Sequence, residues 1–152
     1  MIKFYLISLL LFTNLFGFTQ TKQINPNKHF ENKNYKEAIK GYKQQLKSNP
    51  KDYHINFMIG QCYLESYIDK SKAVDYFKTV TSTSDSSDIA HFYLAKAYHQ
   101  DYKFDLAINT FEYYIKHTED STVIKDALQY ITYCKNGKYH LANPQNIRLK
   151  NL

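Results

Sequence analysis

Histidines, cysteines and carboxylates are the side chains of this sequence that could do chemistry, and their spacing gives no site. None of the six histidines belongs to an HExxH motif or another close ligand pair. The chain also lacks a Gly-x-Ser-x-Gly nucleophile motif, a P-loop and a dinucleotide fingerprint, and it has only 4 glycines. The sequence therefore predicts no enzyme activity, no cofactor and no metal site, and it gives a small hydrolase very little weight.

A polar stretch, TSTSDSSD, carries two carboxylates three positions apart, at Asp85 and Asp88. A cation site is one interpretation of this pair. We favour a flexible polar turn that begins the next helix, because Ser, Thr and Asp side chains bond to nearby backbone in turns.

The two cysteines, Cys62 and Cys134, lie 72 positions apart. A disulfide remains open for an exported chain, although isolated cysteines on apolar helix faces are more often buried thiols. Neither has the close second ligand that a zinc site requires.

The first residues have the layout of a secretory signal peptide. A cation at Lys3 precedes a largely apolar run, Phe4 to Phe12, and small or polar residues follow at Gly17 and Thr19. We expect residues 1–19 to be the signal and the mature chain to start near Gln20. An uncleaved anchor is the alternative, and a lipid-anchored form is disfavoured because no Cys lies directly after the apolar run.

The charge balance is basic, with 20 Lys and Arg against 14 Asp and Glu. The lysines are scattered singly, which predicts a solvated basic surface suited to acidic partners or to an anionic membrane face. Export and the lack of a basic run interleaved with aromatics argue against nucleic acid as a partner.

A pattern of small and aromatic residues recurs along the chain. The pairs Ala38/Tyr42, Ala73/Phe77 and Ala107/Phe111 are separated by 35 and 34 residues, and Gly60 and Ala95 are again 35 apart. Small residues let two helix backbones approach closely, and the large residues three or four positions away fill the flanking grooves. The pattern therefore predicts a series of packed helix pairs.

This pattern resembles the tetratricopeptide repeat. One unit matches it at Ile59, Gly60, Tyr63, Ala73 and Phe77; the next at Leu94, Ala95, Tyr98, Phe104, Ala107 and Phe111; and an earlier partial unit at Tyr35, Ala38, Tyr42 and Pro50. The usual Trp is replaced by Asn56 and His91, and the middle unit has one extra residue near YIDKSK. His91 takes the large-residue position of the repeat, so we expect it to pack rather than to bind a metal. The resemblance implies an all-α solenoid of helical hairpins, with about three repeats, a C-terminal cap helix and a short extended tail.

The helical periodicity and its breaks divide a repeat domain, residues 20–136, into seven segments. We predict helices over residues 24–33, 35–48, 52–66, 70–81, 87–100, 103–117 and 121–135. The last would cover the open end of the stack.

In the family, the first helices of the repeats line a concave groove that binds an extended peptide or a partner helix. By position, the resemblance places ten residues in this groove: His54, Phe57, Gln61, Leu64, Glu65, Ile89, Phe92, Lys96, His99 and Gln100. It implies a non-enzymatic protein-binding adaptor. Two alternatives stay open: exposed tyrosines could bind glycan or peptidoglycan, or the groove could be empty or covered by the chain's own tail.

The ending, with Cys134, Asn136-Gly137 and ANPQNIRLKNL, resembles a junction in exported Bacteroidota proteins of the OmpA family. In these, a tetratricopeptide segment precedes a propeller-like domain and a peptidoglycan-binding domain, and some act in type IX secretion. The resemblance implies an envelope protein in the periplasm or on the periplasmic face of the outer membrane, near outer-membrane or peptidoglycan complexes. We expect residues 137–152 to be an extended tail or the start of a missing domain, so peptidoglycan anchoring does not carry over.

Overall fold

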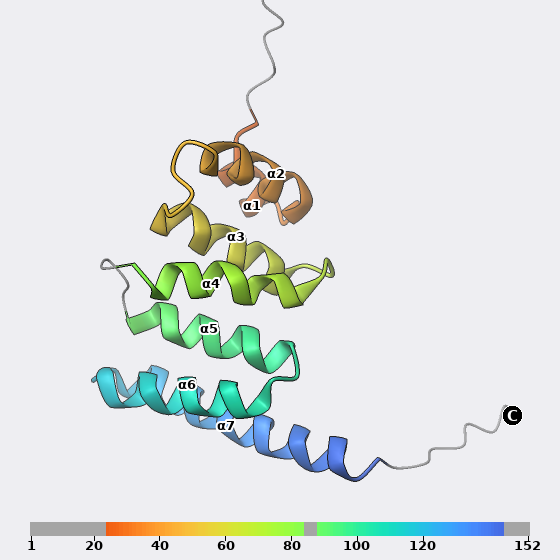
Figure 1. Cartoon of the computed structure of the whole chain (residues 1–152), viewed down its shortest axis with the longest axis vertical. Helices are drawn as coiled ribbons and strands as arrows, with labels where there is room; N and C mark the ends of the chain where they lie inside the picture. The colour runs from red at the N-terminus through yellow and green to blue at the C-terminus, as the bar shows by residue number, and fades with distance from the viewer. Residues whose placement is uncertain (1–23, 84–87, 145–152) are drawn as a thin grey trace, which may run out of the picture.

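Seven α-helices and one short 3₁₀-helix make up the described part of the chain, residues 24–83 and 88–144 of the computed structural model (Figure 1). In chain order they are α1 (Pro26–Glu31), α2 (Tyr35–Leu46), α3 (Tyr53–Glu65), η1 (Lys70–Lys72), α4 (Ala73–Thr81), α5 (Asp88–Gln100), α6 (Phe104–His117) and α7 (Ser121–Ala142). The predicted all-α class is confirmed. The expected signal and half of the TSTSDSSD stretch, residues 84–87 with Asp85, lie outside the described residues.

Each helix packs on the next one along the chain, and neighbouring helices run in alternating directions (Figure 1). Beyond the next helix, the substantial contacts in the part of the chain that the structure describes join α3 to α5 and α5 to α7, apart from those of η1. The result is a sequential array of helical hairpins.

Side-chain caps fix the start of three helices. Asp52 accepts a hydrogen bond from the backbone N–H of Ile55 at 2.9 Å, before α3, and Asp120 accepts one from Thr122 at 2.9 Å, before α7. Asn25 does the same for Lys28 at 3.3 Å, before α1. A carboxylate or amide oxygen satisfies a backbone donor that has no partner within the helix, which is why these helices begin where they do.

The turns that follow α1 and α5 share one geometry. Lys33 and Tyr102 both have a φ of 57°, in the left-handed region. The next backbone N–H bonds back over five residues in each turn, from Asn34 to the carbonyl oxygen of His29 at 2.8 Å and from Lys103 to that of Tyr98 at 2.9 Å. This is the Schellman turn that commonly ends helices, here without glycine at its left-handed position.

The core forms where the small residues meet aromatic rings. Ala38, Ala73 and Ala107 are fully buried. A Cβ on Gly60 would come within 2.7 Å of the ring of Phe77, which is itself fully buried. The close approach predicted from the small residues is confirmed at Gly60.

The last helix extends beyond its predicted end. The sequence predicted a stop at Lys135 and an extended tail from Gly137, whereas α7 continues to Ala142. This boundary was wrong because Gly137 does not break the helix: it lies against the ring of Phe104, where a Cβ would come within 2.5 Å. An ion pair between Lys138 and Asp105 also joins α7 to α6. Residues 145–152, the rest of the expected tail, lie outside the described chain.

Candidate partner-binding face

The odd-numbered helices α3, α5 and α7 approach one another on one side of the array. α3 contacts α5 and α5 contacts α7, while no comparable contact joins α2 to α4 or α4 to α6 among the described residues. An array whose alternate helices are closer on one side curves toward that side. We call the surface formed by α3, α5 and α7 the inner face.

Aromatic rings join α3 to α5 on this inner face. The ring of Phe57 meets that of Tyr93 edge to face, with centroids 5.1 Å apart, and meets Phe77 in the same way at 5.6 Å. Tyr93 in turn stacks on Phe77 at 5.7 Å. These spacings are typical of favourable aromatic pairs, and Phe57 and Tyr93 remain half-buried. The cluster fixes the distance between the two helices.

Lys96 stands among rings from α5 and α7. Its Nζ lies 5.3 Å from the ring centroid of Tyr93, 5.7 Å from that of Tyr130 and 6.0 Å from that of Phe92. A cation at this distance from several ring faces is attracted by them. Among the described residues no carboxylate lies within ion-pair distance of this half-buried ammonium group.

Tyr130 is the contact that ties α7 to this surface. Its ring stacks on Phe111 at 5.3 Å and meets the rings of Phe92 at 6.0 Å and His99 at 5.7 Å. Burial raises the pKa of the Tyr130 hydroxyl, and the negative charges of Asp126 and Glu65 raise it further.

His99 and Gln100 close the inner face at the end of α5. Burial lowers the pKa of the His99 imidazole, so its neutral form is favoured. The Gln100 Oε1 atom is buried and accepts no hydrogen bond from the described residues. Gln100 and His99 line a shallow hollow of about 390 Å³ together with Lys70, Tyr102 and Phe104.

The ten residues predicted for the groove fall into different environments. Phe57, Phe92, Lys96 and His99 take part in the connected ring contacts above. Glu65 is exposed and Gln61 half-buried, whereas Leu64 is 2 % exposed and belongs to the core. Ile89 is exposed near the start of α5.

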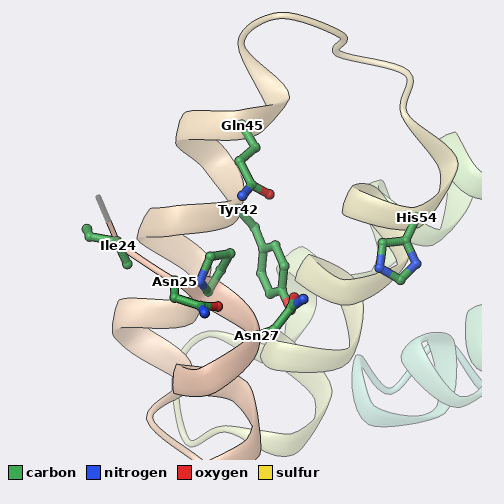
Figure 2. Close-up of a pocket in the computed structure, with 7 residues that line it drawn as sticks. Ile24, Asn25, Asn27, Tyr42, Gln45 and His54 are labelled. Atoms are coloured by element: carbon green, nitrogen blue, oxygen red, sulfur yellow. The ribbon is translucent and has the colours of Figure 1, made fainter. Parts of the chain in front are cut away.

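His54 lies beside a different hollow. This hollow, of about 390 Å³, lies between the start of α3 and the α1–α2 hairpin, and Figure 2 shows His54 at its edge with Tyr42 and Asn27. The Tyr42 hydroxyl donates a hydrogen bond to Asn27 Oδ1 at 2.7 Å. Burial raises the pKa of Tyr42 to about 12, so this tyrosine is a neutral donor.

Two aromatic residues of the inner face, Tyr93 and Tyr130, were missed by sequence reasoning. Tyr130 could have been found, because it stands 34 residues after Lys96, which stands 35 after Gln61. The last helix was predicted only to cap the stack, so none of its side chains was assigned to the groove. Tyr93 precedes the small-residue motif by two positions, and no spacing rule distinguishes it from a core residue.

Reactive groups do not gather on this face. Among the described residues, no three His, Cys, Asp or Glu side chains are placed to hold a metal ion. Cys62 and Cys134 are free, buried thiols, and burial raises their pKa to about 12 and about 11. None of the helices in residues 24–83 and 88–144 is long and apolar enough to cross a membrane.

Comparison with known proteins gives no match to this sequence, either among protein-family models or among curated proteins.

Proposed function

We propose that this chain is a non-enzymatic adaptor of the cell envelope, exported to the periplasm or to the periplasmic face of the outer membrane. In this proposal it is built from about three tetratricopeptide units, and the inner face binds a segment of another envelope protein. The observation that carries the proposal is the Lys96 cluster, in which one half-buried ammonium group is held by aromatic rings from two helices and has no carboxylate partner among the described residues.

The packing of the helices supports a repeat origin for the array. The small residues Gly60 and Ala95 take the same position in α3 and α5, and the buried rings of Phe77 and Phe111 take the same position in α4 and α6. Repeats of this kind form extended concave surfaces because each unit is rotated slightly relative to the last. An inner face that spans three helices suits an extended peptide or a partner helix.

The chemistry of the inner face favours a partner segment with an apolar side chain beside an acceptor. The half-buried rings of Phe57, Tyr93 and Tyr130 offer apolar area and the Lys96 Nζ offers donors, while Glu65 can repel an acidic residue placed out of register. Aromatic residues with a few fixed polar groups are typical of the energetically dominant part of an interface.

A photo-crosslinking residue at Gln61, introduced in cells, tests the proposal. We expect a defined adduct with one envelope protein. In binding measured with that purified partner, we expect Lys96→Gln to weaken the affinity by roughly tenfold, the loss of about 1.4 kcal/mol that a central contact supplies. Lys125→Gln, at an exposed lysine of α7 that takes no part in the ring contacts above, is the matched control. Equal affinities of the two variants would contradict the proposal.

A glycan or peptidoglycan binder is the second candidate. Several tyrosines are exposed: Tyr67, Tyr102, Tyr113, Tyr133 and Tyr139. Exposed aromatic rings can stack on sugars, whereas a protein-binding adaptor without a wall-binding domain should stay soluble when mixed with purified sacculi. If the protein sediments with the sacculi, and if replacing these tyrosines reduces the sedimented fraction, the glycan hypothesis is favoured.

A further inference from the structure

A line of lysines follows one side of α2. Lys36, Lys40, Lys43 and Lys47 are spaced by four, three and four residues, which places them on one stripe of a helix. All four are exposed. We call these four residues the lysine face; α2 is not one of the helices that form the inner face.

The segment that contains the lysine face holds most of the net charge of the chain. Residues 33–51 contain six lysines and a single carboxylate, Glu37, so they carry +5 of the formal +6. Glu37 pairs with Lys40 at 3.9 Å, and both side chains are exposed, so this pair is weak. Along the sequence these lysines look scattered. Only their helical spacing shows that they lie on the same side of α2.

Neighbouring groups fix the position of one lysine of this face, Lys43, and leave it positively charged. Lys43 Nζ donates a hydrogen bond to the Tyr63 hydroxyl at 3.1 Å and lies 5.9 Å from the ring of Tyr76. The hydrogen bond to Tyr63 is the main reason that the pKa of Lys43 is raised. Lys43 is therefore a charged group with a fixed position.

An exposed aromatic side chain adjoins the lysine face. Tyr67 is 106 % exposed, in the connection after α3. Lys36 lines two hollows. The first, of about 470 Å³, runs along α2 and is also lined by Lys40, Lys43 and Lys47. The second, of about 540 Å³, is also lined by Lys33 and Tyr67. Glu65 also lines the second hollow. Basic groups and a protruding tyrosine thus form one continuous surface.

We propose that the lysine face docks on a bilayer of anionic phospholipids, with Tyr67 placed among the headgroups. Lysines on long flexible stems interact with a negative surface as point charges and need no fixed partner geometry. Tyrosine is enriched at membrane interfaces because its ring is apolar and its hydroxyl is polar. The described residues contain no arginine, so the positive charge of this face rests on lysines, which are attracted to a diffuse negative surface without the bidentate geometry that arginine gives to single carboxylates or phosphates.

Co-sedimentation of the full chain with vesicles tests this. Phosphatidylcholine vesicles measure attachment that does not depend on lipid charge, including attachment through the apolar first residues. Mixed phosphatidylcholine–phosphatidylglycerol vesicles add negatively charged headgroups, so the difference between the two vesicle types measures the attachment that depends on lipid charge. We expect stronger partitioning to the mixed vesicles, reduced by high salt because salt screens exposed charges.

Two variants that each remove four positive charges distinguish the effect of the lysine face on vesicle binding from the effect of net charge. One replaces the lysine face with glutamines (Lys36→Gln, Lys40→Gln, Lys43→Gln and Lys47→Gln), and the control does the same at Lys28, Lys116, Lys125 and Lys135, which are exposed elsewhere. We expect the first to lose roughly fivefold of the charge-dependent partitioning for each lysine that contacts the headgroups, and the control to retain most of it. Circular dichroism confirms that both remain helical.

Tyr67→Trp gives an independent readout, since the chain has no tryptophan. We expect its emission to shift to shorter wavelength on anionic vesicles, and that of the control Tyr139→Trp on exposed α7 to stay unchanged. Equal partitioning of the two glutamine variants, or no difference between the two lipid mixtures, would overturn the proposal. So would salt-sensitive binding to polyglutamate in the absence of vesicle binding, which would assign the face to an acidic protein.

Discussion

The ring of Phe104 lies against Gly137, so closely that a Cβ on Gly137 would come within 2.5 Å of the ring's Cζ. Phe104 is 7 % exposed and begins α6, and Gly137 lies in the last third of α7. The missing side chain of the glycine therefore lets the extended part of α7 pack on α6.

Replacement of Gly137 by alanine should destabilise the fold. Alanine would gain about 1 kcal/mol of intrinsic helix propensity, but it would displace a buried ring, at a cost of roughly 1–3 kcal/mol. Urea unfolding should show a net loss of stability for Gly137→Ala. The adjacent exposed substitution Asn136→Ala should leave stability unchanged or raise it slightly. Net stabilisation by Gly137→Ala would contradict the contact with Phe104.

Replacement of Lys33 by glycine should stabilise the fold. Lys33 is exposed and has a φ of 57°, a conformation that costs a side chain about 1–2 kcal/mol. Glycine removes this strain but is more flexible in the unfolded chain, so we expect a gain of roughly 0.5–1 kcal/mol in the free energy of unfolding. Lys36→Gly, inside α2, should instead cost about 1 kcal/mol. A loss of stability in both variants would rule out the left-handed turn.

The stability of the protein should fall when His99 is protonated. Burial lowers its pKa in the folded state below the ordinary value of 6.5, so the unfolded chain binds the proton more readily. The contribution of His99 to stability is thus complete above pH 6.5 and is lost as the pH drops toward the folded-state pKa. His99→Asn should show a smaller loss of stability between about pH 7 and pH 5 than the parent. Identical slopes for His99→Asn and the parent would contradict this prediction.

The thiols of Cys62 and Cys134 should be unreactive until the protein unfolds. Both side chains are fully buried, and burial raises their pKa to about 12 and about 11, so almost no thiolate exists at neutral pH. Alkylation followed by mass spectrometry should modify neither in the folded protein and both after denaturation without reductant. An added Tyr102→Cys, at an exposed turn, should react at once. A mass that shows two oxidised cysteines would contradict the free thiols.

The sequence predicted the helical elements well because periodicity and breaks depend on nearby residues. The segment near residues 103–117 becomes α6 (Phe104–His117) almost unchanged. The end of α7 was different: Asn136-Gly137 has the local character of a breaker, and only its contact with Phe104, 33 residues earlier, keeps it helical. Helix propensity and periodicity depend on nearby residues, so they cannot predict a contact between residues that are far apart in the sequence.

The inner face could be predicted only in part for the same reason. Positions such as Phe57 and Lys96 follow from spacing along one helix, whereas the role of Tyr130 depends on α7 lying beside α5. Leu64 shows the opposite error: its position suggested the groove, but it is 2 % exposed in the core. Spacing gives the side of a helix, and the neighbouring helix decides which of those side chains remain accessible.

The neighbour-to-neighbour order of the helices also bears on how the chain folds and opens. Most contacts join segments that are close in sequence, so little chain entropy is lost before a pair of helices can form, and folding should be fast for a domain of this size. The ends have a neighbour on one side only, so amide hydrogens in the short α1 should exchange sooner than those in α4 and α5. The array would then open from its ends while its central hairpins stay closed.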